Sequence, residues 1–449
     1  MVIKQNPTIK LQIGDEVNAW GHKFTWTDRH ISEETYKYRR YSYDELGEQA
    51  YKALIQLRTS KDQDLYALFK ENRDQHPVLQ KFWTEVSSTP AWVDWDAVGR
   101  GQDVFNRYGM AITLGLAYQS LLGATGSNGR SAETLSRTGG FDLNSVRRRL
   151  METTQFIMQC TESVANLRPD GDGFISILRV RWLHAAVRRR ILDLVATRPS
   201  YYSVDENGIP INDSDSRYTI VTFSSTVIWQ SLPRLGIHLK PQEIEDYLAL
   251  WRLIAFYIGT PHDEFAQAVT AKATLDSMLL FEYDPTETSK RLARNIIRGL
   301  ENNPPAYASR SLLETYTRWL NGGELSDSLG IGRPPWYYWV IISSQVALTS
   351  IVYNLARNIP AVDGYLSRQF RRDVWRAVRE KERGGLDVLS LFTFRLIPEL
   401  SAAGKKVEPD VVERGAGFVL TADMVAILVA LGWAAVLGTT VAAVWHVSS

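Results

Sequence analysis

The sequence predicts an all-α protein, and three observations support this prediction. Apolar residues recur at steps of three and four through most of the chain, which is the period of an amphipathic helix. Short runs rich in glycine, proline and asparagine separate these stretches, and we find no convincing run of alternating strand residues and no internal repeat. The expected helices are 88–105, 103–123, 131–136, 142–166, 174–195, 213–234, 241–259, 263–281, 286–300, 309–320, 336–356 and 367–380.

Four segments are expected along the chain. Residues 1–80 are polar and aromatic, and they predict an N-terminal helical extension. Residues 81–400 hold most of the expected helices and form the main domain. Residues 401–417 contain glycine, proline and charged side chains, which is typical of a linker. Residues 418–447 are expected to form a transmembrane tail anchor.

The anchor prediction depends on the run 424–447, which contains no Asp, Glu, Lys or Arg. As a helix this run would be about 36 Å long, enough to cross a hydrocarbon core of about 30 Å with some tilt. A second uncharged run, 336–356, carries many serine, threonine and amide side chains, so we expect a core helix there. Small residues spaced by four within the anchor could let a second copy approach and form a homodimer: Ala426, Ala430, Ala434, Gly438 and Ala442.

Charge and motif content exclude several classes of function. Lysine plus arginine (51) nearly equals aspartate plus glutamate (50), so nothing indicates a nucleic-acid partner. The single cysteine, Cys160, cannot supply an intramolecular disulfide or a cysteine-ligated iron–sulfur cluster. Motifs of zinc proteases, P-loop enzymes, dinucleotide-binding folds and serine hydrolases are absent. No Cys-x-x-Cys-His motif attaches a haem covalently, although a non-covalent haem would need only one histidine.

The stretch RVRWLHAAVRRR (179–190) places His184 beside the apolar stripe of an expected helix. The histidine therefore faces inward, with Arg181 and Arg188 about one turn away on either side. An inward histidine is either a core residue or a ligand to a metal or cofactor. These residues alone leave both interpretations open.

Polar side chains on the preceding expected helix form a second candidate group. Arg149 and Thr153 are four residues apart and hence lie on one helix face. Glu133 lies upstream, in the stretch GRSAETLSRTGGFD. Taken by themselves, Arg149 predicts a surface ion pair and Glu133 a solvated helix position.

Six ordered blocks of the chain resemble the latex-clearing protein family. These proteins are haem-dependent rubber oxygenases, and related membrane-bound oxygenases of fungal secondary metabolism share their catalytic domain. The resemblance runs from about Thr89 to about Pro398, and it implies a globin-like helical core with additional helices that encloses a non-covalent haem b within 81–400. The blocks are TPAWVDWDAVGRGQDVFNRYG, AETLSRTGGFD, RRRLMETTQFI, RVRWLHAAVRRR, GIPINDSDSRYTIVTFS and LGIHLKPQEIEDYLALWRLIAFYIG.

The resemblance assigns a role to each candidate residue. It makes His184 the proximal haem ligand and, with it, the metal ligand, and Arg188 the family's conserved arginine one turn on. Arg149 and Thr153 match the distal arginine and threonine, and Glu133 matches the glutamate that acts as a base on the allylic proton. One position departs from the family pattern. Glu152 stands where some rubber oxygenases carry a lysine that caps the haem iron.

The activity implied is the oxygenation or cleavage of a carbon–carbon double bond by O₂. The expected tail anchor favours a lipophilic, isoprenoid-like substrate, with the catalytic domain on the cytosolic side of the endoplasmic reticulum. The Glu152 departure casts doubt on polyisoprene as that substrate. Two other classes remain open on the residues alone. One is a non-oxidative isomerase or epimerase on the same scaffold, and the other is a cofactor-free, membrane-anchored interaction protein.

Overall fold

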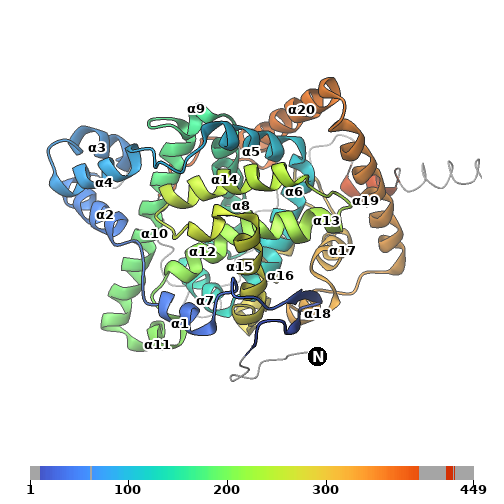
Figure 1. The fold of residues 1–449 in the computed structure, drawn as a ribbon, viewed down its shortest axis with the longest axis horizontal. Coiled ribbons are helices and arrows are strands. Elements are labelled where there is room, and N and C mark those ends of the chain that lie inside the picture. The colour runs from blue at the N-terminus through green and yellow to red at the C-terminus, as the bar shows by residue number, and fades with distance from the viewer. Residues whose placement is uncertain (1–10, 61–62, 394–420, 428, 430–449) are drawn as a thin grey trace, which may run out of the picture.

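The computed structural model describes residues 11–60, 63–393, 421–427 and 429, and helices dominate this part of the chain, as the sequence predicts. Figure 1 shows them gathered into one body, with α2, α3 and α4 projecting at one side. The elements are β1 Glu16–Ala19, β2 His22–Thr25, α1 Glu33–Arg39, α2 Glu45–Leu57, α3 Leu65–Asn72, α4 Pro77–Ser87, α5 Trp95–Arg107, α6 Gly109–Leu114, η1 Gly115–Thr125, α7 Gly129–Thr138, α8 Val146–Thr161, α9 Val164–Leu167, α10 Asp172–Thr197, η2 Pro199–Tyr201, α11 Val204–Asn207, α12 Asp213–Phe223, η3 Val227–Ser231, α13 Leu232–Arg234, α14 Pro241–Tyr257, η4 Asp263–Ala266, α15 Ala268–Phe281, α16 Glu287–Leu300, α17 Arg310–Asn321, α18 Gly323–Ser328, α19 Trp336–Ala356, α20 Pro360–Arg379 and η5 Lys381–Arg383.

A small antiparallel hairpin of β1 and β2 is the one place in the described residues where the all-helical prediction is wrong. Its turn is Trp20–Gly21, because Ala19 pairs directly with His22. Both turn residues have positive φ (54° and 77°), as a two-residue hairpin turn that matches the strand twist requires. His22 Nε2 lies 3.0 Å from Asp276 Oδ1 on α15, so the hairpin is fastened to the helical body.

Two expected helices are divided in the structure. The stretch 103–123 is shared by α5, α6 and the π-helical segment η1, and 213–234 by α12, the π-helical segment η3 and α13. The chain stays helical through these junctions, so the apolar pattern alone does not reveal them. The bounds of α16, Glu287–Leu300, come within one residue of the expected 286–300.

The packed core is built around α5, α8, α10 and α14. Helix α5 begins at an N-cap, Asp94, whose side chain accepts hydrogen bonds from two backbone amides of the first turn. It lies so close to α14 that a Cβ at Gly101 would come within 2.2 Å of the Asp246 carbonyl oxygen. Large side chains such as Trp182 and Trp251 are fully buried in this core. Loss of such a side chain would cost about 3–5 kcal/mol.

Buried arginines on α10 join the N-terminal helices to this core. Arg181 donates to both carboxylate oxygens of Asp44, at 2.6 and 2.7 Å, and to Glu85 Oε1 at 2.8 Å. Arg181 is only 3% exposed, so these charge-assisted bonds lie away from solvent. Residues 1–80 therefore meet the main domain through ion pairs as well as apolar packing.

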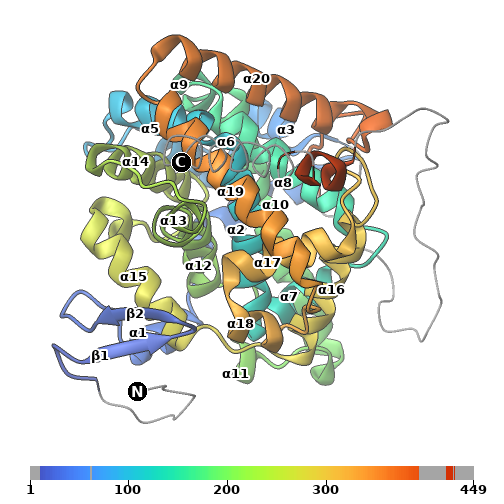
Figure 2. The same cartoon turned by 90° about the vertical axis from the view of Figure 1, so that its right-hand side faces the viewer.

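Helix α19 corrects the prediction of a core helix at 336–356. The helix has the expected bounds, but only 22% of its most apolar stretch is buried inside the protein. In Figure 2 it lies on the outside of the body, across α17. Among the described residues it is the one helix that is long and apolar enough, by length and composition alone, to cross a membrane.

The expected tail anchor lies largely outside the described residues. Of the uncharged run 424–447, the structure describes only 424–427 and 429. The expected linker 401–417 also lies outside them.

Candidate functional site

His184 is a half-buried imidazole on α10, and we find no hydrogen-bond partner for its ring among the described residues. Burial, reinforced by the nearby Arg188 cation, lowers the pKa of His184 from 6.5 to about 4. The ring is therefore neutral at physiological pH. A neutral imidazole that is not used in a hydrogen bond has a nitrogen lone pair free to bind iron or another metal. The residue thus fits the proximal haem ligand that the resemblance implies, and this role stays a prediction.

Arg188 is 2% exposed, and its guanidinium is fully engaged with protein groups. It donates to Glu48 Oε2 at 3.2 Å, and to the backbone carbonyls of Pro210 and Ile211 at 3.2 and 2.8 Å. It also lies over the Tyr43 ring, 4.5 Å from the ring centroid. These contacts fix the turn of α10 that follows His184. The cofactor-binding role of Arg188 stays a prediction.

Helix α8 carries Arg149 and Thr153 and packs against α10. Ser176 Oγ donates to Gln159 Oε1 at 2.7 Å and fixes the register of the two helices near their connection. From this bond, Thr153 is about 9 Å along α8 and His184 about 12 Å along α10, at 1.5 Å per residue. The two residues therefore lie at similar distances along the helix pair from this bond, and their membership in one site stays a prediction. The Thr153 hydroxyl, like the His184 ring, has no hydrogen-bond partner that we find among the described residues.

Arg149 is held by a buried carboxylate on its own helix. Its Nη1 donates to Glu152 Oε2 at 2.9 Å. The other oxygen of Glu152 accepts from Arg148 Nε at 3.1 Å and from Ser390 Oγ at 3.0 Å. Gly140 leaves room for this arginine, because a Cβ there would lie 2.9 Å from Arg149 Nε. The charge of Arg149 is thereby partly neutralised and its side chain is fixed.

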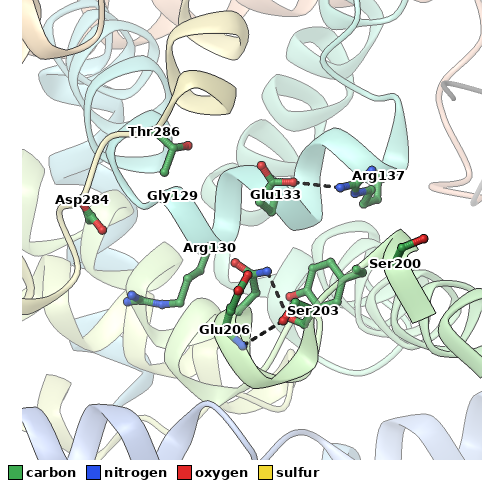
Figure 3. Close-up of a pocket in the computed structure, with 11 residues that line it drawn as sticks. Gly129, Arg130, Glu133, Arg137, Ser200, Ser203, Glu206, Asp284 and Thr286 are labelled. Carbon is green, nitrogen blue, oxygen red and sulfur yellow. Dashed lines mark hydrogen bonds and ion pairs between the residues drawn. The ribbon is translucent and has the colours of Figure 1, made fainter. Parts of the chain in front are cut away.

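Glu133 lies apart from these groups. It is on α7 and lines a polar cavity of about 460 Å³, which Figure 3 shows with Arg137 beside Glu133 and with Ser203 and Glu206 across from it. Glu133 Oε2 pairs with Arg137 Nη2 at 3.2 Å, and Oε1 accepts a hydrogen bond from Thr288 Oγ1. Within the described residues, no hydrogen bond or ion pair joins Glu133 to Arg149, Thr153 or His184. Its role as a base stays a prediction.

Sequence reasoning missed the groups that hold the candidate residues in place. Glu48, Ser390 and Tyr202 are examples, and Tyr202 joins α7 to α10 by approaching Thr134 Oγ1 at 3.2 Å while packing in one cluster with Val187. Each is distant in the chain from the residue it supports. The buried positions of α10 give a weak signal, because a buried arginine on an apolar face requires a carboxylate partner somewhere in the fold.

The described residues form a mostly helical protein whose central helix pair, α8 and α10, carries a neutral, half-buried histidine. The chain belongs to the family described as ER-bound oxygenase mpaB/B'/rubber oxygenase, catalytic domain, whose model matches residues 102–353. This match contains all five predicted site residues, and oxygenase activity is a property of the family.

Two relatives support the assignment. A rubber oxygenase of Streptomyces sp. (strain K30) is 24% identical over 316 residues, which cover 69% of this chain and 75% of the relative. The solved structure of the latex clearing protein LCP in the closed state superposes with a TM-score of 0.58 at 22% identity. That superposition covers 75% of this chain and 91% of the other, and it shows that the fold is shared.

Proposed function

We propose that this protein is a haem b-dependent oxygenase that uses O₂ to oxygenate or cleave a carbon–carbon double bond of a lipophilic, isoprenoid-like substrate. The observation that carries the proposal is the neutral imidazole of His184, half-buried on α10 and without a hydrogen-bond partner among the described residues. Membership in an oxygenase family supports the type of reaction.

The residues around His184 fit a haem on chemical grounds. His184 would hold the haem through a ring nitrogen, and bound haem would supply redox-active iron for chemistry with O₂. Arg188 keeps a positive charge close to the ring and favours its neutral, ligating form. Contacts of Arg188 with Glu48 and two carbonyls fix that charge in place.

On α8, Arg149 and Thr153 offer hydrogen-bond donors close to the same helix pair. A fixed arginine can stabilise negative charge that develops on a substrate or oxygen atom, and it needs little reorganisation because Glu152 already orients it. The free hydroxyl of Thr153 can donate or accept a hydrogen bond.

Glu133 would accept an allylic proton from the substrate at its carboxylate. The cavity that it lines could admit part of a substrate, and the ion pair with Arg137 would orient the carboxylate. For this role, the bound substrate must extend from the cavity lined by Glu133 to the residues of α8 and α10.

We also propose that the chain is a single-pass, tail-anchored protein of the endoplasmic reticulum, with its catalytic domain in the cytosol. The uncharged run 424–447 supports this location, and its small-residue ridge would suit a homodimer. The test compares alkaline carbonate extraction of the full chain with that of a chain truncated after Ile427. The full chain should stay in the membrane and the truncated chain should be released, whereas release of both would refute the anchor.

The reaction is tested by incubating the purified protein with lipophilic alkenes such as squalene and cis-polyisoprene in detergent. An oxygenase should consume O₂ and form carbonyl or hydroxylated products. Conversion of an alkene without O₂ consumption would favour the isomerase alternative. A protein that shows neither turnover nor bound haem would favour the cofactor-free interaction protein.

A further inference from the structure

The outside of α19 and the first turns of α20 carry a continuous exposed apolar surface. We define it by the outward side chains that are at least one-third exposed: Trp336, Tyr337, Trp339, Val340, Leu348, Ile351, Val352, Leu355, Ile359, Val362 and Tyr365. Trp336 is 77% exposed and Leu355 61%. An exposed apolar area of this extent marks an interaction site, because isolated surface apolar residues are common but contiguous ones are not.

The polarity of α19 is inverted relative to a helix of a water-soluble surface. Several of its polar side chains point into the protein: Tyr316 donates to Gln345, and Ser350 Oγ donates to the Gly236 carbonyl at 2.7 Å. Asn354 Nδ2 also donates to the Gly236 carbonyl, at 3.2 Å. Ser343 is an exception, because it is exposed and donates to the Trp339 carbonyl of its own helix. Ile341 and Ile342 are buried, but many other apolar side chains of α19 point outward, so water is an unfavourable medium for this outward face.

The composition of the surface matches the interface of a lipid bilayer. Tryptophan and tyrosine, which are enriched at the headgroup level of membranes, stand at the start of α19 and near the start of α20. Along α20, the exposed stripe continues from Val362 and Tyr365 to the exposed Arg368 and Arg372. Arginines next to an apolar face suit anionic lipid headgroups.

The start of the C-terminal apolar run is fastened beside this surface. Asp423 Oδ2 accepts a hydrogen bond from the Ser309 backbone amide at 2.7 Å, and its Oδ1 accepts one from the Tyr338 hydroxyl at 3.1 Å. Tyr338 belongs to the first turn of α19. The uncharged residues 424–447 therefore begin at the edge of the same surface, so a segment that enters a bilayer there would bring the outer face of α19 to the lipid.

From these observations we propose that the exposed face of α19 and the start of α20 lies on the surface of a lipid bilayer and is immersed at headgroup level. This contact adds to the proposed tail anchor and is independent of haem binding. It would set the orientation of the catalytic domain on the membrane, so that the domain does not move freely on a tether.

The test introduces one exposed cysteine at a time into the full chain, whose native Cys160 has 0% exposed surface. Val340→Cys, Ile351→Cys and Val362→Cys are spin-labelled, and the protein is reconstituted into phosphatidylcholine–phosphatidylserine vesicles. Lys70→Cys on α3, on the opposite side of the body in Figure 1, is the matched control. Collision with lipid-soluble O₂ is compared with collision with a water-soluble nickel chelate.

We expect the O₂-to-nickel ratio at the three surface positions to exceed that at Lys70→Cys several-fold. Ratios equal to the control would show that the surface is in water and would overturn the proposal. Protection from both reagents would overturn it too, because the surface would then be covered by protein, either residues 428–447 or a second copy. Carbonate extraction of the same vesicles reports on the tail anchor separately, and haem content reports separately on the proposed cofactor.

Discussion

Arg149 Nη1 donates a hydrogen bond to Glu152 Oε2 at 2.9 Å, within one turn of α8. The resemblance to rubber oxygenases places an iron-capping lysine at this position in some members, and a carboxylate cannot replace an amine as a neutral nitrogen ligand. In this structure Glu152 turns toward Arg148, Arg149 and Ser390 and is 7% exposed. These interactions fix the Glu152 carboxylate and the Arg149 side chain relative to each other.

Substitution of Glu152 tests this organising role. Glu152→Gln should lower the free energy of unfolding by about 1–3 kcal/mol, because a buried, charge-assisted network loses its charge. Glu33→Gln removes a similar carboxylate from the exposed pair with Lys37, and it should cost less than about 1 kcal/mol. Urea unfolding of the three proteins measures both effects. Equal midpoints for wild type and Glu152→Gln would contradict the organising role.

Arg188 gives a second prediction about stability. Arg188→Met should lower the free energy of unfolding by about 1–3 kcal/mol, because the buried Glu48 carboxylate keeps Lys52 but loses its arginine partner, and two backbone carbonyls lose their donor. The nearby Arg190 is exposed, so Arg190→Met should stay within about 0.5 kcal/mol of wild type. Thermal unfolding monitored by circular dichroism compares the two variants. Similar melting temperatures for both would show that the contacts of Arg188 contribute little.

The sequence predicts the helical class well because the helical period is a local property of the chain. The bounds of α16 and α19 lie close to those expected for this reason. The β1–β2 hairpin escaped prediction because its strands are only four residues long each, too short for alternation to stand out. The burial of α19 was predicted wrongly because a run of apolar residues looks the same whether it faces a core or a membrane.

For the candidate site too, some features follow from the local sequence and others do not. The inward direction of His184 follows from its position beside the apolar stripe, and the structure places the ring there. The partners of Arg149 and Arg188 differ in how far they could be foreseen. Glu152 is a local i+3 neighbour, whereas Glu48 lies 140 residues away from Arg188 in the chain. Such distant pairs depend on tertiary packing, which no local pattern encodes.

The titration of His184 predicts a pH dependence for the haem-free protein. The pKa of His184 is about 4 in the folded protein, against 6.5 for an ordinary histidine, which is the value expected in the unfolded chain. Between pH 4 and 6.5 the unfolded chain therefore binds a proton that the folded chain does not. Stability is therefore lost as the pH falls from 6.5 to 4, by up to about 3 kcal/mol for this group.

Asp215 opposes this effect, since burial raises its pKa to about 6 and its contribution grows as the pH falls through the same range. The prediction therefore concerns the difference between wild type and His184→Gln. Urea unfolding at pH 7 and pH 4.5 should show His184→Gln gaining stability relative to wild type at the lower pH. No change in the difference would mean that His184 titrates normally.

Glu133→Gln separates catalysis from cofactor binding. The amide keeps the size and hydrogen-bonding capacity of the side chain but cannot serve as a base, so turnover should fall by about 10²–10⁴-fold if proton removal limits the rate. Haem content should be unchanged, because within the part of the chain that the structure describes the side chain of Glu133 bonds to Arg137 and Thr288 and not to the helix that carries His184. The measurement is product formation from whichever lipophilic alkene the wild-type protein converts. Full activity would remove Glu133 from the mechanism, and loss of haem would make it a structural residue.

The most direct test of the central claim is the haem content of purified wild type, His184→Ala and His262→Ala, measured from the Soret band and by pyridine haemochrome assay. His262 is the matched control because burial also lowers its pKa, while it lies beside Trp92 and not on α10. Wild type and His262→Ala should hold about one haem per chain and His184→Ala none, since a non-covalent haem depends on its axial histidine. Retention of haem with an unchanged spectrum in His184→Ala, or a wild-type protein without haem after expression with a haem supply, would contradict the account.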